Sequence, residues 1–423
     1  MNSFAIQMPA FGMTDILVLM VTSLLLWFLL SPALRNSPQW RATVTPLASI
    51  IGSGFLVVAP LLAFMAGRYA VLAITAIVIV AWLVGGAIRF NIRHIEPIVE
   101  SDAVNDSREK LMQWLERISK VALSIAYIIA VAFYLELLGA FVLRLFEVES
   151  ELMQKLLATG LLIFIAGVGW WRGLRMLEGL EEYAVAIKLA IIAGLLVGLM
   201  SFNAELVVAG QWLWPDMGVT WSAHTFFQLL GAFLIVQGFE TSRYLHGVYP
   251  ADTRITSMQK SQIISGVIYV GFIALATPLF ADFTGISETG IIDLSGRVAY
   301  VLPVLLILGA VMAQFSASVA DTISSGGLAQ EASRGKLQHR YIYIVSTMLA
   351  CLLVWASDIF AVIAYASRAF AAYYALQCMM ASMQCFYPAR NQPREWGRGL
   401  LYLLLTLLML VTFIYGVSAE SNA

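Results

Sequence analysis

The sequence predicts an all-α polytopic membrane protein of about twelve transmembrane helices, ten of which form two five-helix repeats of inverted topology. Three observations lead to this prediction. The chain is 60% hydrophobic and 12% charged, its apolar residues recur in runs of about 20 residues, and two of these runs are interrupted by glycine. Such a composition excludes an ordinary soluble domain.

Each apolar run is long enough for a helix to cross the hydrocarbon core of a bilayer, which is about 30 Å thick. We expect no cleavable signal peptide, because the first run is too long and lacks a basic leader. The three cysteines lie inside apolar runs, which favours packing over disulfides or a metal site. The expected spans are residues 14–34, 44–67, 69–90, 118–145, 153–171, 183–202, 221–245, 261–282, 298–326, 340–357, 359–386 and 398–417.

The loops between these spans differ in their content of basic residues. Alternate loops carry nineteen of the 25 lysines and arginines, at residues 35–41, 89–120, 172–175, 243–260, 334–340 and 390–398. The opposite loops carry Arg68, Arg144, Lys155 and Arg297. The positive-inside rule therefore predicts that the first set of loops is cytoplasmic and that both termini lie outside, in a protein of the cell membrane.

Ten of the spans divide into two sets with matching spacing. Spans that begin near residues 44, 69, 118, 153 and 183 have counterparts near 221, 261, 298, 340 and 359. Because five is an odd number, the second set enters the membrane from the opposite side, which defines an inverted repeat. The expected organisation is an extra N-terminal helix with its link (1–43), a first repeat (44–202), a second repeat (203–386) and an extra C-terminal helix (387–423).

The first helix of each repeat contains glycine near its centre, in Ile51-Gly52-Ser53-Gly54 and in Val236-Gln237-Gly238-Phe239. Glycine lets the backbone leave helical geometry and turn its N–H and C=O groups toward a cavity. Paired breaks of this kind indicate the substrate site of a transporter. N–H groups at the first break would bind a carboxylate, and carbonyls at the second would bind an ammonium group. The alternative is that Gly52 and Gly54 only allow close helix packing.

Several motifs resemble those of the amino acid–polyamine–organocation (APC) superfamily. Ile51–Phe55 resembles the motif of its first core helix, and Gly238-Phe239-Glu240, with Tyr249-Pro250 and Arg254 after it, is similar to the sixth-helix motif and the following loop. Lys188 resembles a lysine that many of these carriers place in the fifth core helix, and residues 328–337 resemble the segment that closes the eighth. The extra N-terminal helix is similar to that of solute:sodium symporters.

The resemblance covers about residues 44–385 and implies the leucine-transporter-like fold. It also implies a secondary active transporter that moves a small organic solute by alternating access, with the solute at the midplane of the membrane. The expected substrate is an amino acid or related amine, moved by proton coupling or by exchange. The first alternative is a sodium-coupled symporter of another small polar solute. A second alternative is a channel or a transporter-like sensor.

Ionisable side chains inside the spans are few, and burying them is costly enough to indicate a partner or a role. Lys188 is expected to project between the first and eighth core helices and to replace a bound cation there, or else to extend its charge to the membrane surface. Ser318 and Asp321, three residues apart on one helical face, suit either an ion pair with Lys188 or a Na⁺ ion. The expected coupling ion is therefore H⁺ or Na⁺.

Two residues at the second break have expected roles. The resemblance implies that Glu240 stabilises the unwound backbone or links it to other helices. Phe239 is expected to lie over the substrate as a gate, or to pack in the core.

Two further expectations concern the first repeat. Glu136 and Arg144 are expected to pair with each other across two turns of one helix. The polar stretch 91–117 is expected to form an amphipathic helix that holds Met112, Trp114 and Leu115 against the bilayer or the bundle.

The sequence contains no constellation that indicates an enzyme, such as HExxH or a nucleophile with its base. Its four histidines are scattered in or near loops, and the net charge of −1 indicates no particular partner. The expected partners are the small-molecule substrate and the lipid bilayer, with no nucleic acid and no cofactor apart from the coupling ion. The sequence does not predict an oligomeric state.

Overall fold

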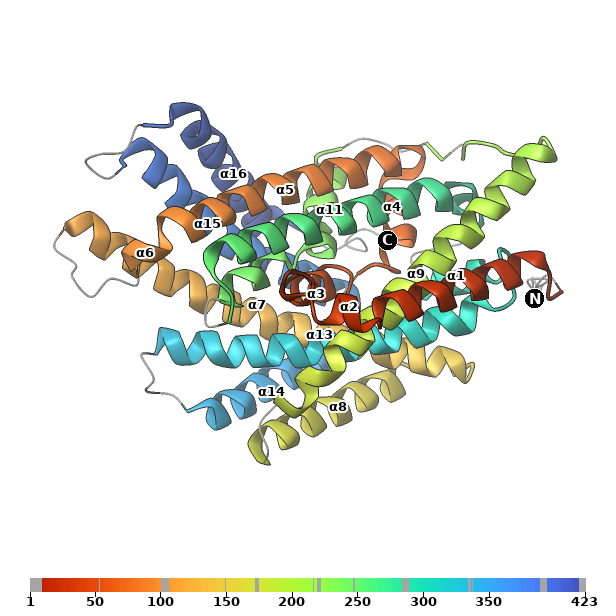
Figure 1. The fold of residues 1–423 in the computed structure, drawn as a ribbon, viewed down its shortest axis with the longest axis horizontal. Helices are drawn as coiled ribbons and strands as arrows, with labels where there is room; N and C mark the ends of the chain where they lie inside the picture. Colours follow the sequence, from red (N-terminus) through yellow and green to blue (C-terminus); the bar gives the residue numbers. More distant parts are fainter. Residues whose placement is uncertain are drawn as a thin grey trace.

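The computed structural model describes residues 10–52, 54–99, 106–148, 150–171, 175–215, 217–218, 222–245, 248–283, 289–333, 336, 338–388 and 394–417. Across these residues the chain is helical and contains no β-strand. Long helices run side by side along the molecule (Figure 1). The elements in chain order are α1 (Met13–Leu29), α2 (Pro32–Arg35), α3 (Pro38–Ile50), α4 (Val58–Ala66), η1 (Gly67–Tyr69), α5 (Ala70–His94), α6 (Glu96–Val99), α7 (Ser107–Leu145), α8 (Glu151–Trp171), α9 (Arg175–Val208), α10 (Ala223–Gly231), η2 (Phe233–Val236), η3 (Phe239–Leu245), α11 (Ala251–Ala276), η4 (Thr277–Asp282), α12 (Gly290–Ser295), α13 (Leu302–Ala332), α14 (His339–Ala356), α15 (Ile359–Phe386) and α16 (Trp396–Tyr415), where η marks a 3₁₀ helix.

The prediction of an all-α polytopic membrane protein is confirmed. Eight helical stretches within the described residues are long and apolar enough to cross a membrane, and α1 and α14 supply shorter apolar helices. The eight stretches, the two shorter helices and the two broken segments, α3–α4 and α10–η2–η3, correspond to the twelve spans that the sequence predicts. Helix α8 is only 22% buried over its most apolar part, as expected for a helix that faces lipid.

Eight of the ten core elements pack into two groups that each combine both repeats, and α9 and α15 are the other two. Helices α7, α8, α13 and α14 pack against one another, and we call them the scaffold group. Elements α3, α5, α11 and η3 pack against one another, and we call them the bundle group. In Figure 1 helices α5 and α11 of the bundle group lie above the scaffold group, and α3 lies near the middle of the view.

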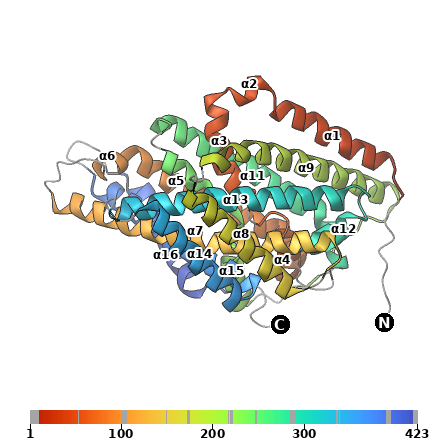
Figure 2. The ribbon, with the colours of Figure 1, turned by 90° about the horizontal axis from the view of Figure 1, so that it is seen from below.

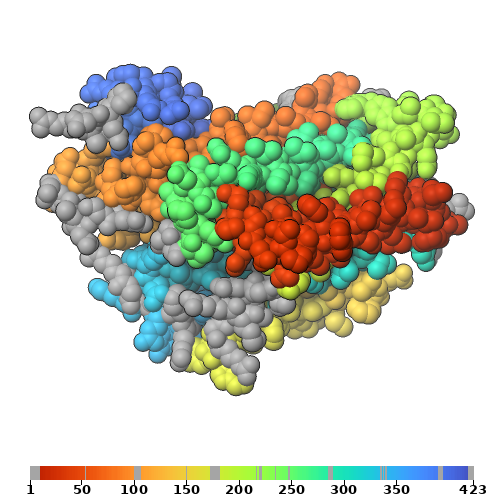
Figure 3. All heavy atoms as spheres, viewed as in Figure 1, coloured from red at the N-terminus to blue at the C-terminus, as the bar shows by residue number. Residues whose placement is uncertain are grey.

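The extra N-terminal helix packs on the fifth core helix. Figure 2 shows α1 along α9, and Figure 3 shows the N-terminal residues on one face of the molecule. Glycines on α9 allow this approach, because a Cβ added at Gly198 would lie 3.2 Å from the side chain of Val18. Beyond α1, the Arg35 guanidinium lies 2.9 Å from the Glu182 carboxylate and ties the link to the start of α9. The extra helix and its link therefore contact α9 at two separate places.

One sequence expectation in the first repeat is wrong in part. The stretch 91–117 does not form a separate amphipathic helix, because α7 begins at Ser107 and continues without a break into the membrane span. Met112 and Leu115 are buried against Ile95 and Met380, which confirms the expected packing against the bundle for these two residues, whereas Trp114 is exposed.

Arg144, which we expected to pair with Glu136, has a long-range partner. Its guanidinium binds the Asp293 carboxylate on α12, with its Nε 2.9 Å from Oδ1. Asp293 on α12 lies beside the C-terminal end of α7, and no local sequence pattern indicates that contact.

Candidate functional site

The first broken helix leaves helical geometry between Ile50 and Val58. Backbone carbonyls that lose their helical N–H donors must find others when they are buried. Side chains from three other helices supply these donors: Lys188 Nζ to the Ala48 carbonyl at 2.6 Å, Tyr269 Oη to the Ile50 carbonyl at 2.9 Å, and Gln314 Nε2 to the Gly52 carbonyl at 2.9 Å. Ser53, which we expected at the substrate site, lies outside the described residues.

The second broken helix differs from the first in its inner half. After α10 the chain continues as two 3₁₀ segments, η2 and η3, rather than as an α-helix on each side of the break. Gly238 separates them with φ +118°, a backbone conformation that residues with a Cβ rarely adopt. The break therefore falls at the glycine that the sequence indicates.

Glu240 holds the second break together. One carboxylate oxygen accepts the Gly238 backbone N–H at 3.0 Å and the Tyr374 hydroxyl at 2.7 Å. The other accepts the Tyr127 hydroxyl at 3.3 Å. Three donors surround this fully buried carboxylate, which links the unwound backbone to α7 and α15.

The two breaks touch each other directly. A Cβ added at Gly238 would lie 2.5 Å from Ser49 Oγ and 2.7 Å from the Ile50 backbone nitrogen. A Cβ added at Gly54 would lie 3.2 Å from the Ile235 Cα. The Tyr269 hydroxyl lies within hydrogen-bond distance of both the Ile50 and the Ile235 carbonyls, at 2.9 and 2.7 Å. Glycines at both breaks are therefore required for close contact, as in the packing alternative that the sequence left open.

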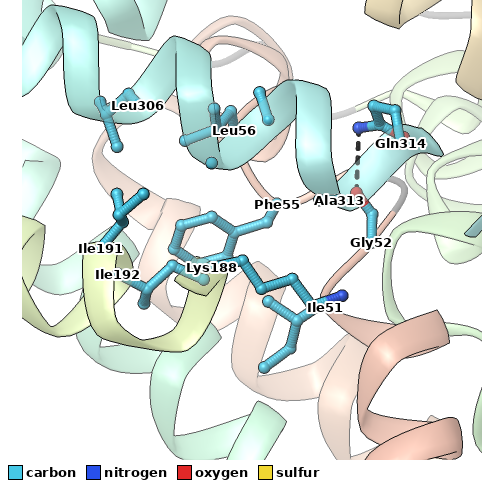
Figure 4. A pocket seen from close by; sticks show the side chains of 12 residues that line it. Ile51, Gly52, Phe55, Leu56, Lys188, Ile191, Ile192, Leu306, Ala313 and Gln314 are labelled. Carbon is cyan, nitrogen blue, oxygen red and sulfur yellow. Dashed lines mark hydrogen bonds between the residues drawn. The ribbon is translucent and has the colours of Figure 1, made fainter. Parts of the chain in front are cut away.

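A cavity lies beside the first break (Figure 4). It holds about 340 Å³ of space between atoms, part of which is open to the surroundings. Its polar side chains are Lys188 and Gln314, and the remaining lining is apolar: Ile51, Gly52, Phe55, Leu56, Ile191, Ile192, Leu306, Gly309, Ala310 and Ala313. The first break, α9 and α13 thus meet around one small, mostly apolar space with a single ammonium group.

Lys188 extends from α9 toward the first break rather than toward the membrane surface (Figure 4). Its side chain is 2% exposed, and its ammonium group donates to a backbone carbonyl of α3. Ser318 and Asp321 are also fully buried, on helix α13, which packs against α9. Ser318 Oγ donates to the Gln314 carbonyl at 2.7 Å, the local hydrogen bond that serines often form in membrane helices.

The predicted residues of the second break make specific contacts. The Gln237 side chain donates to the Tyr134 hydroxyl at 3.1 Å. The Gly238 carbonyl, which we expected to face a substrate ammonium, accepts the Thr241 hydroxyl at 2.8 Å. Phe239 is fully buried and stacks on Tyr374 with the ring centres 5.3 Å apart. Val236 is buried as well, so in this conformation the protein itself covers the second break.

Sequence reasoning missed Tyr269 and Gln314, the donors that complete the first break. Both are polar residues inside apolar runs, and that is the one signal that could have indicated them. The partner carbonyls lie 219 and 262 residues away along the chain, so no local pattern relates them.

This geometry defines a class of protein: a polytopic helical membrane protein in which two broken helices from inverted repeats meet inside the bundle, as in secondary transporters. The chain belongs to the APC superfamily of transporters, because the profile of a family described as "APC superfamily transporter" matches residues 32–416. A relative from Aquifex aeolicus (strain VF5), an uncharacterized protein, is 42% identical over 411 residues, which cover 96% of this chain and 98% of the relative.

Solved structures of transporters share this fold. A Na⁺-coupled sialic acid symporter in a substrate-bound outward-open state matches with a TM-score of 0.53 and 14% identity, over 96% of this chain and 98% of the symporter. A mutant form of the Eremococcus coleocola manganese transporter matches with a TM-score of 0.56 and 12% identity, over 89% of this chain and 87% of that chain. At such identities the likeness concerns the fold, and with the family it identifies a multi-pass secondary transporter.

Gly54→Val is expected to abolish transport while the protein still inserts into the membrane. A β-branched side chain at this position would enter the space of Ile235 and push the two breaks apart. Uptake by reconstituted protein and the amount of protein in the membrane measure the two effects. Gly327→Val is the matched control, because a Cβ at Gly327 meets nothing within 4 Å. Normal uptake by Gly54→Val would show that the contact between the breaks is unnecessary.

Proposed function

We propose that this protein moves a small organic solute, an amino acid or related amine, across the cell membrane by alternating access, and that protons or solute exchange drive the movement. The basic loops lie in the cytoplasm and both termini lie outside, as the positive-inside rule predicts. The solute binds where the two broken helices meet.

The observation that carries this proposal is the buried ammonium group of Lys188 at the first break. It lies 2.6 Å from the Ala48 carbonyl, an oxygen of the kind that coordinates a cation where a helix is unwound. A fixed positive charge beside this oxygen repels a sodium ion and takes its place. Because an ammonium group can release its proton when its surroundings change, Lys188 is suited to proton coupling.

The second break supports a substrate with an ammonium group. Gln237 Oε1 is buried and has no hydrogen-bond partner among the residues that the structure describes. A buried amide oxygen without a donor is costly, and a substrate N–H group would remove that cost. Gln237 lies next to Gly238, where the backbone turns out of helical geometry, so this side chain stands at the second break itself.

Uptake of labelled amino acids and amines into proteoliposomes tests this function. We expect accumulation to follow an imposed proton gradient, or exchange against solute loaded inside, with no dependence on Na⁺ at constant pH. Strong stimulation by Na⁺ at constant pH would contradict the proton-coupled proposal. That result would favour the sodium-coupled alternative, in which the oxygens of Ser318 and Asp321, both buried on α13, take part in binding the ion.

A further inference from the structure

A charged cavity lies at the end of the molecule that the positive-inside rule places in the cytoplasm. It holds about 570 Å³ of space, part of it open to the surroundings. Its lining combines Glu96 and Val99 of α6, Glu116 and Lys120 of α7, Arg243 and Tyr244 of η3, and Glu331 of α13. The cavity therefore lies between elements of the bundle group and of the scaffold group.

Two ion pairs at this cavity differ in burial. Glu116 and Arg243 are both nearly inaccessible, and their side-chain atoms approach to 3.1 Å. Lys120 and Glu331 approach to 2.8 Å but remain partly exposed. Only the first pair joins the two groups, since Glu116 lies on α7 and Arg243 lies on η3, whereas α7 and α13 both belong to the scaffold group.

Gln377 on α15 connects this buried pair to α5. Its amide oxygen accepts bonds from Asn91 on α5, at 2.8 Å, and from the Arg243 guanidinium. Its amide nitrogen donates to Ser119 Oγ at 3.0 Å and to Glu116 Oε2 at 3.3 Å. An amide can accept and donate in this way because it carries both kinds of group. Gln377 thus joins the bundle group, the scaffold group and α15 at one point.

A second arginine extends the network within the bundle group. Arg254 at the start of α11 donates to the Arg243 backbone carbonyl at 2.7 Å. Its guanidinium also binds both carboxylate oxygens of Glu96, at 3.1 and 2.8 Å. These bonds join η3, α6 and α11. They therefore fix the position of the Arg243 backbone relative to the bundle group.

We propose that Glu116, Arg243 and Gln377, with Asn91 and Ser119, form a cytoplasmic lock that holds the bundle group against the scaffold group and closes the route from the broken helices to the cytoplasm. The proposal rests on the alternating access proposed above and goes beyond it by assigning the closed cytoplasmic state to particular residues. Separating the groups exposes the buried pair to water, and the charged cavity becomes the mouth of the route.

The energetics of the lock follow from burial. Hydrogen bonds between charged groups are about twice as strong as neutral ones, and they are stronger in a dry interior than at the surface. Removing one partner leaves the other charge buried and uncompensated. Each change in the lock should therefore shift the balance toward a state in which water reaches the remaining charge, which is the state with an open cytoplasmic side.

Tyr127→Cys provides a reporter for this opening. Tyr127 is fully buried on α7, about three helical turns beyond Glu116, and its hydroxyl donates to Glu240 on η3, so it lies between the scaffold group and the bundle group. A membrane-impermeant thiol reagent is applied to the cytoplasmic face of inside-out vesicles that contain the full chain. Peptide mass spectrometry then measures labelling of the introduced cysteine separately from Cys351, Cys378 and Cys385.

Gln377→Leu and Glu116→Gln, each combined with the reporter, are expected to raise its labelling rate about tenfold. Arg93→Gln is the matched control, because Arg93 forms an exposed ion pair with Asp252 outside the lock, and it should leave the rate unchanged. Unchanged labelling in both lock variants would overturn the proposal. If Gln377→Leu does not fold, Glu116→Gln decides alone, since it keeps the size of the side chain and removes only the charge.

The experiment is independent of the substrate. Labelling requires no transported solute, so a failure to find the solute leaves this test intact. Conversely, a rate that does not change would reject the lock while leaving the proposed substrate and its coupling to be tested by uptake.

Discussion

Gly238→Ala is expected to abolish transport and to destabilise the protein more than alanine at any helical glycine with open space around it. Gly238 has φ +118°, where a side chain is strained by about 1–3 kcal/mol. Its Cβ would also lie 2.7 Å from the Ile50 backbone nitrogen, so the first break would have to move. Overpacking of this kind costs a further ~1–3 kcal/mol. Thermal unfolding of the purified protein and uptake in proteoliposomes measure the two effects.

Gly271→Ala is the matched control for this change. Gly271 lies within α11, and a Cβ there meets nothing within 4 Å. Alanine at such a helical position is expected to leave transport unchanged and to be neutral or stabilising by up to ~1 kcal/mol. Equal unfolding temperatures for the Gly238→Ala and Gly271→Ala proteins would show that the second break tolerates a side chain, contrary to the geometry described here.

Lys188→Ala is expected to lower proton-driven uptake by ~10- to 100-fold while the protein still expresses and inserts. The substitution removes a charged hydrogen bond to the Ala48 carbonyl, an interaction worth ~1.5–3 kcal/mol. It also leaves that buried carbonyl without its donor and opens the cation position beside it. Uptake driven by a pH gradient, measured with and without Na⁺, distinguishes loss of coupling from general loss of activity.

Lys155→Ala is the control for the loss of a lysine side chain. Lys155 pairs with Glu151 one turn away on α8, and the partner carboxylate is well exposed. Exposed pairs of this kind contribute little, so uptake should remain close to that of the unchanged protein. If Lys188→Ala also transports normally with the same dependence on the proton gradient, Lys188 has no part in coupling.

The sequence predicted the framework of the fold in considerable detail. The expected span 359–386 coincides with α15, and the expected span 153–171 differs from α8 only at its start. A long apolar run predicts a membrane helix reliably, because a segment that crosses the bilayer must form its backbone hydrogen bonds within its own helix. Where polar residues continue a helix, the prediction failed: α7 begins at Ser107 rather than at residue 118, since tertiary contacts bury Met112 and Leu115.

The positions of the two breaks could also be predicted, but their geometry could not. Glycine marks where a helix can unwind, and both breaks occur there. Whether the freed backbone faces a ligand or the protein depends on neighbours elsewhere in the chain. The first break is completed by donors that lie 140, 219 and 262 residues from their acceptors. The resemblance implied a role for Glu240 at the second break, but no local pattern indicates that the segment after Gly238 is a 3₁₀ helix.

The sequence by itself therefore determined the membrane class, the twelve spans, the inverted repeat and the family. These properties follow from local composition and from motifs, because a bilayer imposes the same requirement on every span. The tertiary structure decided which side chains meet: Lys188 with the Ala48 carbonyl, Arg144 with Asp293, and Glu116 with Arg243 and Gln377. The physical reason is that a buried polar group is stable only with a partner, and packing of distant helices selects that partner.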